Sequence, residues 1–259
     1  MITLAISGCS GKMGQRIAAL ASADPMFVIK AAIEAQSHPD IGKSLADLLA
    51  VSRLSVRIQS EPEVIKDVDV LIEFSSTAAT MAHLVLALKY KKAMVIGTTG
   101  FNHQQVQDIE RAATKLPIVF SPNMSLGVNL LFHLAREAAQ GLGKEYEVRI
   151  SEAHHVHKKD APSGTAKRLA EIIKESRAKS PEIPIDSIRE GEIVGDHSIF
   201  FESAQDSVTL THHAKTRDIL AQGALEAARF VAKQPAGLYG MQNVIEYMKR
   251  QGSAKNAKN

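Results

Sequence analysis

The sequence of 259 residues is poor in aromatic side chains and in cysteine. Trp is absent, Phe and Tyr number only 8 and 4, and the net charge is +3. This composition argues against a nucleic-acid-binding surface, which combines a row of basic residues with stacking aromatic residues, so we expect no nucleic-acid partner. The single cysteine, Cys9, excludes an internal disulfide and favours a reducing, cytoplasmic compartment.

The chain also has no long apolar run. None approaches the roughly 20 residues that a helix needs to cross a bilayer, so we expect no membrane partner. The N-terminal segment runs directly into a glycine loop without a basic leader or cleavage signal, so we expect no secretory peptide. Hydrophobic residues make up 45% and charged residues 23%, which is typical of a chain that builds one sizeable core or two modest ones.

A glycine loop follows the first predicted strand. The apolar run Ile2–Ser7 predicts a buried strand, and the helical spacing of apolar residues in Gln15–Ala23 predicts a helix. Between them lies GCSGKMG, residues 8–14, one residue away from the dinucleotide fingerprint GxGxxG. Glu34 ends the next predicted strand, where a carboxylate binds an adenosine ribose. The alternative is a packing turn followed by a surface glutamate.

Strands and helices alternate through the first half of the chain. The predicted strands are Ile2–Ser7, Phe27–Ile33, Val68–Phe74, Ala93–Ile96 and Pro117–Phe120, and the predicted helices are Gln15–Ala23, Thr77–Tyr90 and Asn102–Lys115. Such alternation with short links predicts an α/β fold with a doubly wound parallel, Rossmann-like sheet. Residues 38–60 show no clear period. Ligands of such sheets bind at the carboxyl ends of the strands, where three polar turns fall, at residues 74–77, 97–100 and 121–124.

The second half predicts a smaller α+β domain with a mixed or antiparallel sheet. The predicted elements are the helices Leu126–Leu142 and Lys167–Lys179 and the strands Glu145–Glu152, Ser187–Val194, Asp196–Glu202 and Ser207–His213. The last two predicted helices, Thr216–Lys233 and Gly240–Arg250, are expected to return and cover the first sheet. We therefore expect a dinucleotide-binding domain of residues 1–125 and 217–259, and a substrate-binding domain of residues 126–216.

A cationic loop connects a predicted strand to a predicted helix in the second domain. The segment EAHHVHKKDAPSGTA, residues 152–166, holds three histidines and two lysines within six positions. Pro162 suits a first helical turn, Ser163 and Thr165 are cap residues, and Gly164 lets a ligand approach backbone N–H groups. Cationic side chains and a positive helix end would attract the same anion, so this loop predicts a carboxylate site.

Two other interpretations of this loop stay open, a basic solvated loop and a metal-binding module. Adjacent residues in one loop seldom converge on a metal, and neither an HExxH helix nor a set of cysteine ligands is present, so we expect no metal. Near the end of the last predicted strand, His212, His213 and Arg217 either line the same cleft or form a polar strand end.

A nicotinamide domain together with a carboxylate-binding loop implies hydride transfer to a small acid. His154 is the predicted general acid, because the ordinary pKa of histidine lies near neutrality. Lys158 would hold the carboxylate or an imine nitrogen, or share the proton step. The alternatives are another two-domain nicotinamide-dependent oxidoreductase acting on a small amino or dicarboxylic acid, and a cofactor-sensing protein without activity.

The chain resembles the dihydrodipicolinate reductase family, the 4-hydroxy-tetrahydrodipicolinate reductases of diaminopimelate and lysine biosynthesis, over nearly its whole length. The resemblance rests on residues 152–166 and on the GxxGxMG form of the glycine loop. It implies that His154 is a proton donor and acceptor, that Lys158 is a proton donor, and that His155, Gly164 and Thr165 bind the substrate. It implies cofactor contacts from Gly8, Cys9, Ser10, Gly11, Lys12, Met13, Glu34, Gly97, Thr98, Thr99, Ser121, Pro122, Asn123 and Met124.

The resemblance also implies a reaction and an assembly. The family reduces a cyclic α,β-unsaturated imine dicarboxylate to tetrahydrodipicolinate with NADH or NADPH, after water is lost from the hydroxylated form. Its members usually form homotetramers through the sheet of the second domain. Many members carry Arg after the acidic cofactor residue, whereas this chain has Ala35 and Gln36 after Glu34. We therefore predict that NADH is preferred and NADPH possible, with Lys43 the cation in reach of a 2′-phosphate.

Overall fold

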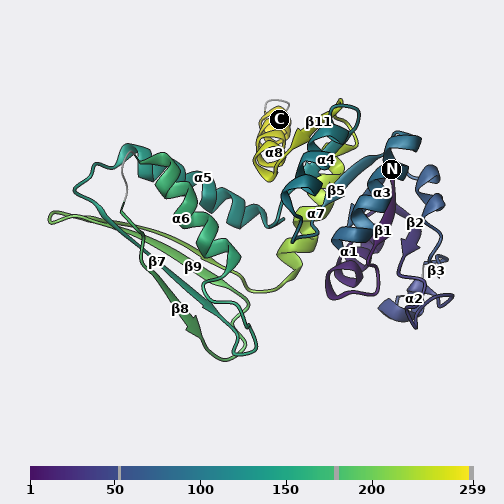
Figure 1. Ribbon diagram of the computed structural model, residues 1–259, viewed down its shortest axis with the longest axis horizontal. Coiled ribbons are helices and arrows are strands. Elements are labelled where there is room, and N and C mark those ends of the chain that lie inside the picture. The colour runs from purple at the N-terminus through teal and green to yellow at the C-terminus, as the bar shows by residue number, and fades with distance from the viewer. Residues whose placement is uncertain (52–53, 178–180, 257–259) are drawn as a thin grey trace. The chain divides into compact units, whose positions relative to one another are not determined.

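The computed structural model describes residues 1–51, 54–177 and 181–256, and the chain divides into two compact units (Figure 1). Unit 1 comprises residues 1–125 and 220–259, and unit 2 comprises residues 126–219. The second crossing between the units therefore lies at residue 220, where the sequence predicted 217.

Unit 1 contains a seven-stranded parallel sheet with the order β11-β6-β5-β4-β1-β2-β3, which confirms the predicted doubly wound fold. Its strands are β1 Ile2–Ser7, β2 Phe27–Ile33, β3 Ile58–Gln59, β4 Val70–Glu73, β5 Ala93–Ile96, β6 Pro117–Phe120 and β11 Gly237–Tyr239. The two edge strands, β3 and β11, have only two and three residues, too few to show a period in the sequence.

The helices of unit 1 follow its strands. They are α1 Lys12–Ala23, α2 Leu45–Leu49, the 3₁₀ helix η1 Pro62–Asp67, α3 Thr77–Tyr90, α4 His103–Ala113, α7 Asp218–Val231, which begins in unit 2, and α8 Met241–Asn256. Caps set several starts, since Ser76 Oγ accepts a hydrogen bond from Ala79 N, and Asn102 with Gln105 forms a capping box at α4.

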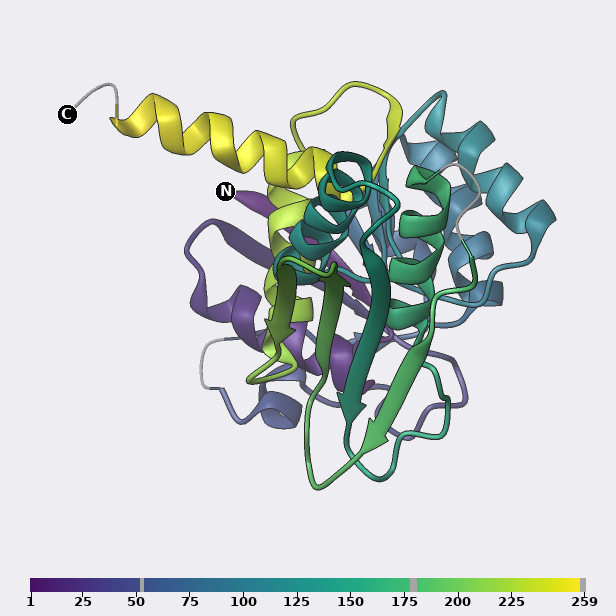
Figure 2. The ribbon, with the colours of Figure 1, turned by 90° about the vertical axis from the view of Figure 1, so that its left-hand side faces the viewer.

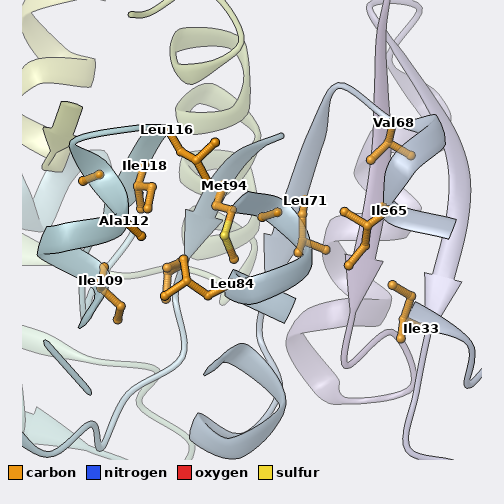
Figure 3. Packing of buried hydrophobic residues seen from close by; sticks show 14 of the residues in the cluster. Ile33, Ile65, Val68, Leu71, Leu84, Met94, Ile109, Ala112, Leu116 and Ile118 are labelled. Atoms are coloured by element: carbon orange, nitrogen blue, oxygen red, sulfur yellow. The ribbon is translucent and has the colours of Figure 1, made fainter. Parts of the chain in front are cut away.

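Apolar side chains from neighbouring strands and helices form the core of unit 1 (Figure 3). Leu71, Met94 and Ile118 from three adjacent strands are fully buried, with Leu84 of α3 and Ile109 of α4 over them. Burial of each such side chain stabilises the fold by about 1.5–3 kcal/mol. The core therefore fixes the carboxyl ends of the strands, where the polar turns lie.

The C-terminal helix α7 packs directly on the turn after β6. A Cβ atom at Gly223 would lie 1.7 Å from the carbonyl oxygen of Met124, so only glycine fits at this crossing. The sequence after residue 220 thus completes unit 1.

Unit 2 contains a four-stranded mixed sheet with the order β10-β9-β7-β8, and α5 and α6 pack on one of its faces (Figure 2). Its elements are α5 Leu126–Gly141, β7 Glu147–His154, α6 Gly164–Ser176, β8 Ile185–Arg189, β9 Asp196–Glu202 and β10 Ser207–His213. Strand β9 pairs antiparallel with β7 and β10 pairs antiparallel with β9, whereas β8 runs parallel to β7.

Two predictions about unit 2 were wrong in detail. The strand predicted at Ser187–Val194 begins and ends earlier, because a turn with Gly191 at φ +49° follows β8. The helix predicted from Lys167 begins at Gly164, since Ser163 is its N-cap, and Pro162 therefore precedes the helix instead of forming its first turn. Residues 178 and 179 of that predicted helix lie outside the described residues.

Within the described ranges, none of the helices combines the length and the apolar character that crossing a membrane requires.

Candidate functional site

Two glycines of the loop between β1 and α1, Gly8 and Gly14, are packed too tightly for any other residue. A Cβ atom at Gly8, whose φ is +72°, would lie 2.4 Å from the carbonyl oxygen of Phe74, and one at Gly14 would lie 2.0 Å from that of Gly8. Helix α1 starts with Gly11 as its N-cap and has no side-chain cap. The first N–H groups of a helix have no partner inside it, so the loop forms a cradle for an anion such as a pyrophosphate.

Glu34 lies beside this loop, as the sequence predicted. Its carboxylate accepts hydrogen bonds from the backbone N–H groups of Ser10 and Ala35, each at 3.1 Å. Glu34 and the loop residues Gly8, Ser10 and Gly11 line a cavity of about 480 Å³. Glu34 and the glycine loop therefore contact each other and border the same cavity.

Three loop residues of the predicted cofactor site, Cys9, Lys12 and Met13, do not line this cavity. Cys9 is completely buried, and burial raises the pKa of its thiol to about 12. It is therefore a neutral packing residue rather than a nucleophile.

The other predicted cofactor residues lie in the turns after β5 and β6, at the same edge of the parallel sheet. The residues from Gly97 to Thr99 follow β5, and those from Ser121 to Met124 follow β6. They do not line the cavity at the glycine loop. Thr98 Oγ1 accepts a hydrogen bond from Ser75 N, in the turn after β4, at 3.2 Å, and Ser121 Oγ donates to Asn123 O at 2.8 Å. The turn after β5 is therefore bonded to a neighbouring turn, and the turn after β6 to its own backbone.

In unit 2, His154 is the last residue of β7 and is paired with a buried carboxylate. Its Nδ1 is hydrogen-bonded to Glu152, whose side chain is completely buried. Arg189 donates two hydrogen bonds to this carboxylate, at 2.9 and 3.1 Å, and Ser163 N donates a third at 3.2 Å. Burial alone would raise the pKa of Glu152, but the hydrogen bonds, led by that from Arg189, lower it to about 2. Glu152 is therefore ionised at neutral pH.

The ionised Glu152 fixes the tautomer of His154. A carboxylate only accepts hydrogen bonds, so Nδ1 carries a proton and Nε2 is the nitrogen that exchanges protons. Burial lowers the pKa of His154, and the charge of Glu152 opposes this shift only in part. A Cβ atom at Gly195 would lie 3.1 Å from His154 Nε2, so the glycine leaves the approach to this nitrogen open.

His197 on β9 was not predicted, although it lies beside His154. It is 4% exposed, the two ring centroids are 5.2 Å apart, and its Nε2 is 3.2 Å from Ser163 Oγ. Burial, followed by the neighbouring His154, lowers the pKa of His197 to about 4, so the ring is neutral at pH 7. The register places His197 opposite Glu152, and the alternation of β9 was the signal that could have revealed it.

Arg189 was also missed, because no sequence pattern links β8 to the carboxylate on β7. Its position follows from the parallel register, in which Arg189 lies opposite His154. The guanidinium matches the carboxylate in a bidentate arrangement, which is the geometry that arginine favours.

The remaining predicted residues lie on the loop after β7 and at the start of α6. Lys158 Nζ donates to Asp160 at 2.7 Å, and Arg217 Nη2 lies 3.1 Å from His155 Nε2. Gly164 is the first residue of α6, and a Cβ atom there would meet nothing within 4 Å. The loop therefore presents cations beside the N-terminus of α6, where Ser163 Oγ accepts a hydrogen bond from Ala166 N at 3.2 Å and Thr165 is the second helical residue.

His212 and His213, left open by the sequence, differ in their contacts. His213 Nδ1 binds Asp196 at 2.6 Å, on the strand beside it. His212 lies opposite His197 in the register, and its Nδ1 is buried without a hydrogen-bond partner among the described residues. Across those same residues, no three His, Cys, Asp or Glu side chains are arranged as metal ligands.

Comparison with known proteins places this chain in a family. The model of the N-terminus of dihydrodipicolinate reductase matches residues 2–124, and that of its C-terminus matches residues 127–245. A 4-hydroxy-tetrahydrodipicolinate reductase of Syntrophobacter fumaroxidans is 37% identical over 95% of this chain and 99% of its own length. Another, of Psychrobacter arcticus, is 39% identical over 95% of each chain.

Solved structures agree with this relationship. A dipicolinate-bound dihydrodipicolinate reductase from Paenisporosarcina sp. TG-14 superposes with a TM-score of 0.77 at 27% identity, over 93% of this chain and 97% of that one. An amine dehydrogenase from Mycobacterium smegmatis, with a TM-score of 0.67 at 11% identity over 92% and 94% of the chains, shares the fold alone. The two family models, the relatives and the fold confirm the resemblance found in the sequence, and this chain belongs to the dihydrodipicolinate reductase family.

Proposed function

We propose that this protein reduces dihydrodipicolinate, formed by loss of water from 4-hydroxy-tetrahydrodipicolinate, to tetrahydrodipicolinate in diaminopimelate and lysine biosynthesis. Membership of the family supports the reaction. The observation that carries the proposal is the pair His154–Glu152 on the strand that leads into the cationic loop and the N-terminus of α6, because it combines a proton donor with a receptor for carboxylates.

The residues of unit 1 suit a nicotinamide dinucleotide. The glycine cradle and the start of α1 would hold the pyrophosphate, Glu34 the adenosine ribose, and the turns at Gly97–Thr99 and Ser121–Met124 the nicotinamide half. When bound, the cofactor supplies the hydride.

The residues of unit 2 would hold the substrate. We assign its carboxylates to His155, Thr165 and the N–H group of Gly164, since the end of α6 contributes about 0.3–1 kcal/mol to binding of an anion in addition to direct hydrogen bonds. Lys158, paired with Asp160, adds a positive charge on the same loop and would serve as a further proton donor. A planar ring with two acid groups matches this distribution of donors.

His154 would hold and deliver the proton that the reduced substrate needs. Glu152 keeps the proton of Nδ1 in place, so Nε2 gives up its proton to the substrate and regains one from solvent. Because burial lowers the pKa of His154, the protonated ring is a stronger acid than histidine in water. General acid catalysis of this kind contributes about 10²–10⁴ in rate.

The decisive experiment is oxidation of NADH on addition of the fresh condensation product of pyruvate and aspartate semialdehyde. The wild-type protein should oxidise NADH, and His154→Gln should lose about 10²–10⁴ of the turnover while it still binds NADH. No oxidation by the wild type, or unchanged turnover in the variant, would refute the assignment.

We also propose that NADH is preferred over NADPH. After Glu34 the chain offers Ala35 and Gln36, neither of which carries a positive charge for a 2′-phosphate. Lys43, the cation that the sequence placed in reach of a 2′-phosphate, donates a hydrogen bond of 2.7 Å to Asp40. Michaelis constants for the two cofactors test this preference, and equal or tighter use of NADPH would contradict it.

We also propose that the protein assembles as a homotetramer through the sheet of unit 2. Its proposed location is the cytoplasm. One face of this sheet carries α5 and α6, and Ile188 on the edge strand β8 is 45% exposed. Light scattering coupled to size exclusion gives the mass, and a monomer at micromolar concentration would contradict the assembly.

A further inference from the structure

A buried carboxylate stands at the carboxyl end of β4, in the middle of the sheet of unit 1. Glu73 follows three buried apolar residues and is itself 0% exposed. Its Oε1 lies 2.5 Å from His83 Nδ1, and its Oε2 accepts hydrogen bonds from Ser75 Oγ at 2.7 Å and Thr80 Oγ1 at 3.4 Å. A carboxylate buried without such partners would be strongly destabilising, so these donors are what makes the site possible.

The network around Glu73 reaches three segments of the cofactor edge. Ser7 Oγ, next to the glycine loop, lies 3.4 Å from His83 Nδ1. Thr98 Oγ1, in the turn after β5, accepts from Ser75 N at 3.2 Å and lies 3.0 Å from Thr80 Oγ1. The turns after β1, β4 and β5 are thus connected through a single set of polar side chains.

Phe74, the neighbour of Glu73, is wedged between two of these turns. A Cβ atom at Gly97 would lie 2.2 Å from the Phe74 ring, and one at Gly8 would lie 2.4 Å from the Phe74 carbonyl oxygen. Backbone hydrogen bonds join the same turns, because Phe74 N donates to Ser7 O at 3.2 Å and Gly97 N donates to Glu73 O at 2.9 Å. Glu73 and Phe74 therefore contact the glycine loop and the β5 turn together.

We propose that Glu73 and His83 are positioning residues for the dinucleotide, which hold the turns after β1, β4 and β5 in the arrangement that binds it. This inference rests on the proposed function, which assigns the cofactor to the same edge. His83 also lines the cavity of about 480 Å³ together with Gly8 and Glu34. The pair thus connects the interior of the sheet to the cofactor cavity.

Glu73 and His83 should affect the affinity for NADH rather than the binding of the imine substrate. Glu73 and His83 belong to unit 1, and the proton donor and the carboxylate receptor belong to unit 2. Loss of the pair should therefore weaken binding of NADH, whereas the KM for the imine substrate should change little.

Three variants test the network. Glu73→Gln keeps the shape, but its NH₂ group must face one of the three donors. His83→Leu removes the donor, whereas His83→Asn keeps an N–H group near the position of Nδ1. We expect Glu73→Gln and His83→Leu to raise the Kd for NADH at least about tenfold, and His83→Asn to stay within about threefold of wild type.

The control is Leu116→Ala, which removes a buried side chain of the same unit away from the turns. It should lower Tm without changing the Kd for NADH, measured by calorimetry at a temperature where all variants are folded. Should Glu73→Gln fail to fold, Thr80→Val removes the hydroxyl between Glu73 and Thr98 at nearly constant shape and should raise the Kd about threefold.

The outcomes distinguish the two proposals. Equal NADH affinity of wild type, Glu73→Gln and His83→Leu would overturn the positioning role alone. A rise in the Kd for NADH of Leu116→Ala as large as that of the network variants would do the same. A wild-type protein that does not bind NADH would overturn the proposed function as well. A rise confined to the network variants, with rescue by His83→Asn, would support both.

Discussion

Replacing Glu152 by glutamine should damage both the stability of unit 2 and its proton transfer. The carboxylate accepts two hydrogen bonds from Arg189, one from Ser163 N and one from His154. An amide has only one accepting oxygen, and both oxygens of Glu152 accept from Arg189, so the NH₂ group must face the guanidinium together with either Ser163 N or the imidazole. Removing one partner from a buried ion pair costs about 3–5 kcal/mol, because the other charge stays buried.

The pKa of Glu152 gives a second estimate of the same magnitude. It falls from the ordinary 4.5 to about 2 in the folded protein. At about 1.4 kcal/mol for each pH unit between these values, ionised Glu152 contributes at most roughly 3.5 kcal/mol of stability at neutral pH. This contribution is complete above pH 4.5 and is lost as the pH falls towards 2, because only the ionised form accepts all four hydrogen bonds.

The same substitution should change the tautomer of His154. An amide that presents NH₂ to Nδ1 makes that nitrogen an acceptor and leaves the proton on Nε2, the wrong arrangement for proton exchange. We expect kcat to fall about 10²–10⁴-fold and the KM for NADH to stay within about twofold. Stopped-flow oxidation of NADH measures the first effect, and urea unfolding followed by circular dichroism measures the loss of stability.

Glu171→Gln is the matched control, because Glu171 forms an ion pair with Arg168 on the surface of α6 in the same unit, with its side chain 59% exposed. Exposed pairs contribute only about 0–1 kcal/mol, so this variant should resemble wild type in both assays. Glu152→Gln with turnover within threefold of wild type and an unchanged urea midpoint would refute the role of Glu152.

Three further predictions concern neighbouring positions. The pKa of His197 is near 4 in the folded protein and 6.5 ordinarily, so between these values the unfolded chain binds more protons, and the free energy of unfolding should fall as the pH drops from 6.5 to 4. His197→Gln should flatten this part of the stability curve, and an unchanged slope would contradict the lowering of the His197 pKa by burial. Gly195→Ala places a methyl group 3.1 Å from His154 Nε2 and should reduce kcat about tenfold without changing Tm by more than about 2 °C, a result that wild-type kinetics would contradict. Ala35→Arg should lower the KM for NADPH about tenfold relative to that for NADH, and a constant ratio would show that the 2′-phosphate lies elsewhere.

The sequence predicted those parts of the fold that have a clear period. Five parallel strands of unit 1, β1, β2, β4, β5 and β6, are short apolar runs between glycine or polar turns, and the sequence predicted each of them within a few residues. Strands β3 and β11 were missed because pairing with a neighbour, rather than their own residues, defines them. The direction of β8 likewise depends on its pairing with β7.

The candidate site divides in the same way. His154, Lys158, Gly164 and Thr165 lie within one continuous segment, so a single motif contains all of them. Arg189 and His197 come from other strands and meet Glu152 only through the register of the sheet.

Glu73 was missed for another reason. A glutamate at the end of an apolar strand ordinarily marks the point where the chain reaches solvent, and only the tertiary structure shows that this carboxylate is enclosed.

The division of unit 1 between the two ends of the chain has a consequence for biosynthesis. Unit 2 has emerged completely from the ribosome once residue 219 has been added and the exit tunnel cleared, whereas the first 125 residues must wait for α7 and β11. Until then β6 has an open edge, where β11 will pair, and the turn at Met124 lacks the helix that covers it. Open strand edges invite association with other chains, so the nascent protein is most exposed to aggregation, and most dependent on chaperones, during translation of its second half.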